Sequence, residues 1–120
     1  MITCAMCDDE LPFAEQLRSL VMAYAKKKRV ELQAETFASA EELLEEIENG
    51  AGFEILFLDI EMRKMDGIEL GKKLRELSYQ TLIIYVSGYD QYMRQLFEAE
   101  PFRFLSKPLK QEELENVLDK

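Results

Sequence analysis

Short apolar runs alternate with helix-like segments along this chain, and this alternation limits its possible folds more than any other feature. Five apolar stretches of strand length occupy residues 2–7, 30–37, 53–58, 82–86 and 102–105. Each is followed by apolar residues that recur every three or four positions, as on one face of a helix. Strands that alternate with helices through short connections form parallel sheets with right-handed crossovers. The sequence therefore predicts an α/β fold with helices on both faces of the sheet.

Local signals predict where the helices begin. Pro12 falls in the first turn of a helix from about Leu11, where its missing N–H has no cost. Ser39 and Glu42 have the spacing of a capping box ahead of a second helix. The other helices are expected to begin near Gly67, Asp90 and Gln111.

The element order predicts a flavodoxin-like, doubly wound sheet of five parallel strands, in the order 2-1-3-4-5, with five helices. Ligands of such sheets bind beyond the carboxyl ends of the strands. The polar residues that follow the predicted strands at this edge are Asp8, Asp9, Asp59, Ser87 and Lys107. We therefore expect them to lie together. No repeat or low-complexity segment interrupts the pattern, so one domain is expected over residues 1–120.

Composition excludes several classes of function. The 15 basic and 24 acidic residues give a net charge of -9, which disfavours binding to nucleic acid. There is no histidine, so imidazole zinc sites, Ser-His-Asp catalysis and a phosphohistidine are excluded. No apolar run approaches the roughly 18 residues of a membrane span, and no secretion signal is evident. A cytoplasmic protein without membrane contact is expected.

Cys4 and Cys7 have the C-x-x-C spacing of some redox and metal sites. Both fall in the first predicted strand, where residues an odd number apart face opposite sides of the sheet. We therefore expect two buried core residues rather than a metal site or a disulfide.

The carboxylates of Asp8, Asp9 and Asp59 would repel one another at a shared sheet edge, so the cluster should hold a cation. Mg²⁺ suits carboxylate ligands combined with phosphate oxygens. Asp59 could then act as a carboxylate nucleophile toward a phosphoryl group, with Lys107 and the Ser87 hydroxyl contacting its oxygens. The residues alone thus predict phosphoryl chemistry with Mg²⁺ as cofactor.

Four segments resemble the response-regulator receiver domain of bacterial two-component signalling. They are CDDE at Cys7–Glu10, DIEMRKMDGIEL at Asp59–Leu70, IIYVSGY at Ile83–Tyr89 and FRFLSKPL at Phe102–Leu109. The resemblance spans the whole chain in order and is strongest to receivers that precede LytTR-type DNA-binding domains.

This resemblance implies roles for the acidic residues. Asp59 corresponds to the phosphoacceptor, and Asp8 and Asp9 to the acidic pair that binds Mg²⁺. Glu61 corresponds to the residue whose main-chain carbonyl is a further metal ligand.

The resemblance also implies a switch. Ser87 corresponds to the switch hydroxyl, Lys107 to the lysine before a usually cis proline, and Phe104 to the aromatic switch residue. Two positions depart from the family pattern. Arg63 replaces a usual proline, which leaves the loop after the acceptor looser or able to pair with an acid, and Gly88 replaces a common alanine.

The family resemblance implies partners. A sensor histidine kinase would donate the phosphoryl group, and the face formed by residues 90–120 would mediate phosphorylation-dependent homodimerisation or an effector contact. Transcription would be controlled through a LytTR-type domain absent from this chain. The domain itself would promote only its own phosphotransfer and autodephosphorylation.

Three alternatives remain open. A stand-alone or degenerate receiver would act as a protein-binding module, although the complete acid, hydroxyl and lysine set argues against degeneracy. A phosphatase of the haloacid dehalogenase type needs an aspartate at the position of Glu61 and a cap domain. A flavodoxin-like FMN carrier needs a Ser/Thr/Gly-rich loop where this chain has Asp8–Glu10.

Overall fold

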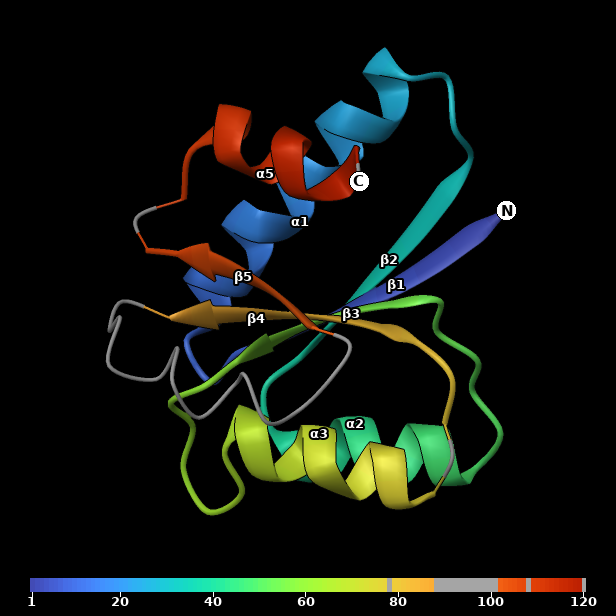
Figure 1. Ribbon diagram of the computed structural model, residues 1–120, viewed down its shortest axis with the longest axis vertical. Helices are drawn as coiled ribbons and strands as arrows, with labels where there is room; N and C mark the ends of the chain where they lie inside the picture. The colour runs from blue at the N-terminus through green and yellow to red at the C-terminus, as the bar shows by residue number, and fades with distance from the viewer. Residues whose placement is uncertain (78, 88–101, 108, 120) are drawn as a thin grey trace.

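The computed structural model describes residues 1–77, 79–87, 102–107 and 109–119 (Figure 1). Its sheet is parallel, with the strand order β2-β1-β3-β4-β5. The strands are β1 (Ile2–Cys7), β2 (Leu32–Phe37), β3 (Ile55–Asp59), β4 (Leu82–Ser87) and β5 (Phe102–Ser106). The described helices are α1 (Leu11–Lys27), α2 (Ala40–Glu48), α3 (Gly67–Glu76) and α5 (Gln111–Leu118). The predicted parallel α/β architecture is confirmed. The helix predicted from Asp90 lies outside the described residues, so the count of five helices stays a prediction.

The sheet is covered on both faces, with α1 and α5 on one side and α2 and α3 on the other (Figure 1). Successive side chains of β3 therefore enter different cores. Leu56 and Leu58 join the cluster that includes residues of α2 and α3, whereas Phe57 joins the cluster that includes residues of α1 and α5. All three are almost fully buried. This two-sided burial explains why β3 reads as a continuous apolar run.

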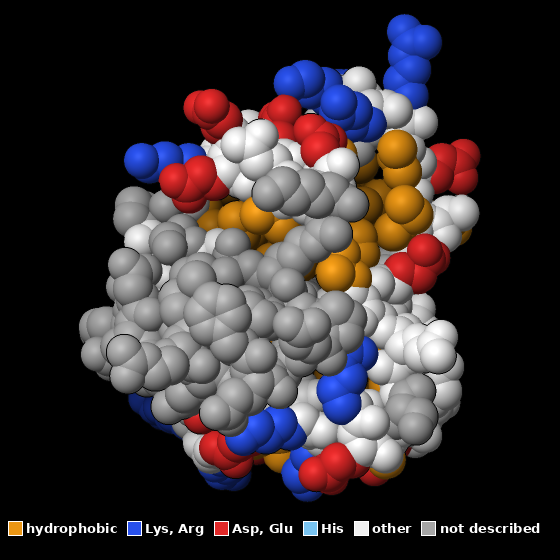
Figure 2. Space-filling model, in the orientation of Figure 1, with side chains coloured by type: hydrophobic (Ala, Val, Ile, Leu, Met, Phe, Trp, Pro, Cys, Tyr) orange, Lys and Arg blue, Asp and Glu red, His pale blue; other side chains and the backbone are white. Residues whose placement is uncertain are grey.

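Apolar side chains also reach the surface on the face shown in Figure 2, where Lys, Arg and acidic side chains border them. Leu82, Val117 and Leu118 are partly buried residues packed against the α1 and α5 cluster. None of the described helices is both long and apolar enough to cross a bilayer.

Cys4 and Cys7 are buried, and neither forms a disulfide. Cys4 belongs to the cluster on the α1 and α5 side, and Cys7 belongs to the cluster on the α2 and α3 side. Burial raises the pKa of Cys4 to about 12, which disfavours the thiolate that metal binding or redox exchange needs. The prediction of two core cysteines on opposite faces is confirmed.

β2 begins at Leu32, two residues later than predicted. Arg29 adopts the left-handed conformation with φ 56°, and the Val30 N–H donates to the carbonyl of Ala25 at 2.9 Å. Val30 is thus used to close the end of α1 and cannot extend the strand. The apolar pattern alone does not reveal this competition.

The predicted N-terminus of α2 is confirmed, with one difference. The Ser39 hydroxyl accepts a hydrogen bond from the Glu42 N–H at 3.1 Å. The Glu42 carboxylate accepts from the Ala38 N–H at 3.4 Å rather than from Ser39 itself. The reciprocal bond of the capping box is therefore displaced by one residue.

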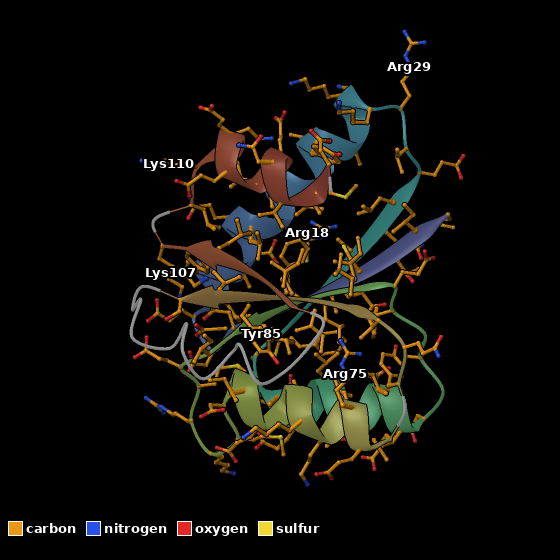
Figure 3. All side chains as sticks on the ribbon, viewed as in Figure 1. Arg18, Arg29, Arg75, Tyr85, Lys107 and Lys110 are labelled. Atoms are coloured by element: carbon orange, nitrogen blue, oxygen red, sulfur yellow. The ribbon has the colours of Figure 1, made fainter. Side chains whose placement is uncertain are left out.

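Gly71 leaves space under α3 for the buried side chain of Tyr85. A Cβ at Gly71 would lie 2.0 Å from the Tyr85 hydroxyl, and Tyr85 is 1% exposed, between the sheet and the α2 and α3 layer (Figure 3). Alanine normally stabilises a helix interior by about 1 kcal/mol relative to glycine. Here we expect Gly71→Ala to lower the free energy of unfolding by roughly 1 to 3 kcal/mol, measured by urea denaturation.

The matching double variant tests this cause. Tyr85→Phe removes the oxygen that a Gly71→Ala methyl group would meet. The loss caused by Gly71→Ala should therefore be clearly smaller in the Tyr85→Phe background. An equal loss in both backgrounds would contradict the steric explanation.

Candidate functional site

Three polar side chains are buried at the carboxyl edge of the sheet, each at the end of a different strand. Asp8 follows β1, Asp59 ends β3 and Ser87 ends β4, with exposures of 3%, 3% and 1%. Backbone pairing fixes this edge, since Asp59 lies opposite Val86 and the Asp8 N–H donates to the Phe37 carbonyl at 3.0 Å. The sheet thus brings together residues that are distant in sequence.

Asp8, Asp9 and Asp59 form a carboxylate cluster. Each offers one oxygen, and these three oxygens lie within 4.8 Å of one another. Asp8 Oδ1 accepts a hydrogen bond from the Glu10 N–H at 2.8 Å, which orients this carboxylate, whereas Asp9 is exposed. The cluster is therefore buried on the side of Asp8 and Asp59 and open to solvent on the side of Asp9.

Lys107 supplies a positive charge to the buried part of the cluster. Its Nζ lies 3.4 Å from Asp8 Oδ2 and 3.4 Å from Asp59 Oδ1. The Lys107 N–H donates to the Ser87 carbonyl at 2.9 Å, and its ammonium lies 4.2 Å from the centroid of the Phe13 ring. Figure 3 shows Lys107 beside the carboxyl ends of β4 and β5. Burial lowers the pKa of Lys107, but the charges of Asp59 and Asp8 outweigh burial and raise it overall.

Asp59 is incompletely neutralised. Burial, and then the negative charge of Asp8, raise the pKa of the Asp59 carboxyl to about 7, although Lys107 and a backbone hydrogen bond from Glu61 act in the opposite direction. Among the described residues, Asp59 Oδ1 has no hydrogen-bond partner, although it forms an ion pair with the Lys107 ammonium 3.4 Å away. Burial also raises the pKa of Asp8. The site therefore favours an additional cation or proton.

The donor set fits a hard divalent cation. Carboxylate oxygens are the ligands that Mg²⁺ and Ca²⁺ prefer, and Asp59 Oδ1, a buried oxygen with no hydrogen bond from any described residue, is well suited to ligation. Asp8, Asp9 and Asp59 are thus the residues that could hold a metal ion here.

Gly67 brings the start of α3 against the acceptor strand. Its N–H donates to the Ile60 carbonyl at 3.1 Å, and a Cβ at this position would lie 2.3 Å from the carbonyl oxygen of Asp59. Asp66 caps the same helix by accepting from the Glu69 N–H at 2.9 Å. From the sequence, Gly67 was predicted only as a helix start. The Asp-Gly pair before an apolar periodic segment was the available signal for a close backbone approach.

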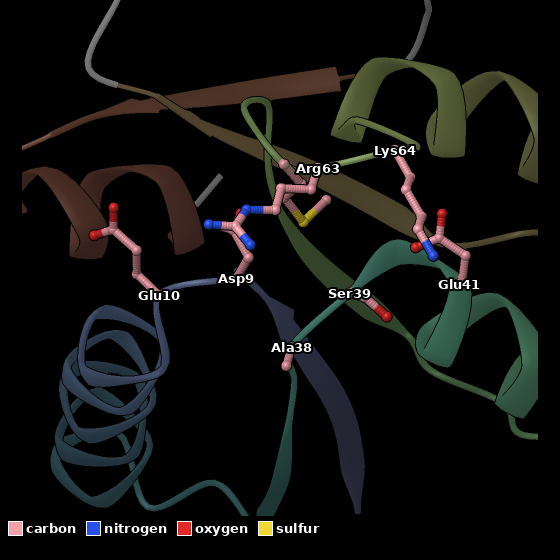
Figure 4. A pocket seen from close by; sticks show the side chains of 8 residues that line it. Asp9, Glu10, Ala38, Ser39, Glu41, Arg63 and Lys64 are labelled. Carbon is pink, nitrogen blue, oxygen red and sulfur yellow. The ribbon is translucent and has the colours of Figure 1, made fainter.

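A cavity of about 540 Å³ opens beside the cluster (Figure 4). Charged residues from two loops and the first turn of α2 line it, namely Asp9, Glu10, Glu41, Arg63 and Lys64. A second cavity of about 390 Å³ also has Asp9 and Arg63 in its wall. Arg63 therefore lies near Asp9, at the open side of the carboxylate cluster. The amino-acid sequence alone did not reveal this position.

The structure describes the side chains of some of the remaining candidate residues but not of others. The Glu61 side chain is exposed, and a role for its main-chain carbonyl stays a prediction. Ser87 is buried at the edge, as expected. Phe104 lies in β5, but its side chain is outside the described part of the chain, as are Gly88 and Pro108.

The chain matches the family of response regulator receiver domains over residues 5–119. It is 29% identical over 118 residues to an uncharacterized response regulatory protein of Vibrio cholerae, covering 98% of this chain and 44% of that protein. It is 24% identical over 120 residues to the sensory transduction protein LytT of Bacillus subtilis, covering 100% of this chain and 48% of LytT. The chain thus spans about half the length of these curated relatives.

Solved structures show the same fold. The response regulatory domain of mrkE from Klebsiella pneumoniae superposes with a TM-score of 0.83 at 18% identity, covering 98% of this chain and 93% of that one. The receiver domain of AraT from Geobacillus stearothermophilus gives a TM-score of 0.81 at 28% identity, covering 98% and 90%. Together with the family match over nearly its whole length, the flavodoxin-like fold shows that this chain belongs to the response-regulator receiver domains.

Proposed function

We propose that residues 1–120 form one receiver domain that is switched by phosphorylation of Asp59, with a sensor histidine kinase as the phosphoryl donor. One observation carries this proposal: a buried aspartate at the end of the central strand has an oxygen without a hydrogen-bond partner in the described part of the chain, and a lysine ammonium lies 3.4 Å from it. An unpartnered carboxylate oxygen is available as a nucleophile, and the ammonium is placed to contact a transferred phosphoryl group.

Mg²⁺ is the proposed cofactor, held by Asp8, Asp9, Asp59 and the main-chain carbonyl of Glu61. When bound, it would neutralise negative charge on the transferring phosphoryl oxygens. The hard oxygen donors and the raised pKa of Asp59 support this assignment.

The transfer step uses the chain's own residues. An oxygen of Asp59 forms a bond to phosphorus while the bond from phosphorus to the imidazole nitrogen of the kinase histidine breaks, and that nitrogen keeps the electron pair. Lys107 then holds one phosphoryl oxygen, and the Ser87 hydroxyl turns to donate to another. Two such contacts approach the roughly 5.5 kcal/mol that inverts a two-state equilibrium. Phe104 is the proposed packing residue that follows the Ser87 movement.

The proposed output is transcription. The curated relatives include sensory transduction proteins named LytT that are about twice as long as this chain. We propose that a LytTR-type DNA-binding domain follows in the complete protein and that phosphorylation promotes homodimerisation or an effector contact through residues 90–120. The net charge of -9 supports a receiver that makes no nucleic-acid contact itself. Slow loss of the phosphoryl group by autodephosphorylation would reset the switch.

Intact mass spectrometry tests the proposal. The protein is incubated with Mg²⁺ and acetyl phosphate, and we expect a gain of one phosphoryl group. Asp59→Asn should abolish this gain because an amide is not a comparable nucleophile. Asp119→Asn is the matched control, since Asp119 contacts Lys28 near the end of α5 instead of the sheet edge. It should be phosphorylated like the unaltered protein.

The other outcomes separate the alternatives. No phosphoryl gain with acetyl phosphate and with a histidine phosphodonor would favour an unphosphorylated protein-binding module. Hydrolysis of many phosphate esters per protein molecule would favour a phosphatase. Equal labelling of Asp59→Asn would reject Asp59 as the acceptor.

A further inference from the structure

We propose that Arg63 is a built-in counter-ion of Asp9 that competes with Mg²⁺ and thereby weakens metal binding at the phosphoacceptor site. This inference rests on the proposed metal site and adds a residue that controls it. Arg63 acts through Asp9, so it is a positioning residue and not a catalytic one.

The geometry places the guanidinium at the open side of the carboxylate cluster. Arg63 and Asp9 line the 540 Å³ cavity together, and both also line the 390 Å³ cavity. In Figure 4 the Arg63 side chain extends toward Asp9. Arg63 and Asp9 therefore border the same open space at the mouth of the cluster.

Asp9 is the cluster member that Lys107 does not neutralise. The described ion pairs of Lys107 join it to Asp8 and Asp59 only. Arg63 is exposed and makes no ion pair within 4.0 Å in the part of the chain that the structure describes, so its guanidinium is a longer-range neighbour of Asp9 and not a direct contact. A metal ion that binds Asp9 must offset the attraction between this carboxylate and the guanidinium, at a cost in affinity.

The loop backbone separates the two adjacent cations. Lys64 adopts the left-handed conformation with φ 62°. In Figure 4, Lys64 extends toward Glu41 and Arg63 extends toward Asp9. Both residues are exposed and line the same cavity. They therefore carry the same charge at neighbouring positions but present it to different acids.

We expect Arg63 to have a moderate effect on the affinity for Mg²⁺. A cation beside the Asp9 carboxylate in a solvent-exposed site partly neutralises this ligand, and this should change Mg²⁺ affinity by about three- to tenfold at low ionic strength. Screening over about 10 Å at 0.1 M salt should reduce this effect at higher salt. Removing Arg63 should thus tighten Mg²⁺ binding most at low salt.

The test measures binding of Mg²⁺ alone by isothermal titration calorimetry, without phosphodonor. We expect Arg63→Gln to lower the Kd for Mg²⁺ by about three- to tenfold. Lys64→Gln removes the same charge one residue away and keeps a Cβ at the left-handed position, so its Kd should change by less than about twofold. Arg63→Lys should resemble the unaltered protein.

A double variant checks that Asp9 mediates the effect. In the Asp9→Asn background, Arg63→Gln should no longer tighten Mg²⁺ binding, because the neutral amide has no negative charge for Arg63 to neutralise. The difference between Arg63→Gln and the unaltered protein should also nearly vanish at about 0.5 M salt.

Several results would overturn the inference while leaving the proposed function in place. These are equal effects of Arg63→Gln and Lys64→Gln, weaker Mg²⁺ binding by Arg63→Gln, or a full effect of Arg63→Gln in the Asp9→Asn background. Absence of Mg²⁺ binding by every protein tested, including the unaltered one, would overturn the proposed metal site together with this inference.

Discussion

Asp59→Asn should make the metal-free protein more stable near neutral pH, although it removes the proposed phosphoacceptor. Burial and the charge of Asp8 raise the pKa of Asp59 to about 7, whereas an aspartate in the unfolded chain titrates near about 3.9. The ionised carboxylate is thus more costly in the folded state. Asparagine has nearly the same shape and no charge. We expect a gain of roughly 2 to 4 kcal/mol in the free energy of unfolding at about pH 7.5.

The direction of the change in stability with pH follows from proton binding to Asp59. Between about pH 4 and 7 the folded protein holds a proton on Asp59 that the unfolded chain has lost. Stability therefore falls as pH rises through this window, and the full cost is present above about pH 7. Below about pH 4 both states are protonated and the cost is absent. Asp59→Asn should flatten this slope, and the two proteins should converge in stability near about pH 4.

Urea denaturation in EDTA across this pH range measures the effect. Asp119→Asn, which alters an aspartate outside the cluster, should not produce the stabilisation near about pH 7.5 that is expected of Asp59→Asn. Adding Mg²⁺ should stabilise the unaltered protein more than Asp59→Asn, since a cation that binds only the folded state adds to its stability. A less stable Asp59→Asn protein at neutral pH would show that the contact with Lys107 outweighs burial.

Gly67→Ala should have the largest destabilising effect among the glycine variants. The added methyl carbon would lie 2.3 Å from the Asp59 carbonyl oxygen and 3.2 Å from Ile60 Cα. Both contacts are with backbone atoms, which cannot turn away as a side chain can. Either α3 must move outward or the end of β3 must bend. We expect the free energy of unfolding to fall by roughly 3 kcal/mol.

The same substitution should impair the site, because the Asp59 backbone positions the acceptor carboxylate. Phosphorylation by acetyl phosphate should slow markedly under conditions where Gly67→Ala remains folded. Gly52→Ala is the matched control, since a Cβ at Gly52 meets nothing within 4 Å. It should keep the stability and phosphorylation rate of the unaltered protein. A neutral Gly67→Ala would contradict the close approach of α3 to Asp59.

Much of the fold was predictable because its signals are local. The periodicity of apolar residues predicted β1 at its observed bounds and the starts of α1, α3 and α5. The errors arose where a tertiary or turn contact competed with the pattern. Val30 closes α1 and so does not pair in the sheet. The Phe53 N–H donates to the Tyr79 hydroxyl at 2.5 Å, and β3 begins two residues later than predicted.

The sequence by itself determined which groups can meet. Alternating strands and helices place Asp8, Asp59, Ser87 and Lys107 at one sheet edge, since parallel strands end on the same side. The absence of histidine left carboxylates, hydroxyls and lysine as the polar groups available there. These conclusions depend only on residue type and order along the chain.

Only the tertiary structure decided how these groups interact. Lys107 and Asp8 are 99 positions apart, yet their charges lie 3.4 Å from each other. The burial that raises the pKa of Asp59, the contact of Gly67 with its backbone and the direction of Arg63 also depend on segments packed from elsewhere. Distance through space and exclusion of water control electrostatic energies, and neither can be read from residue order.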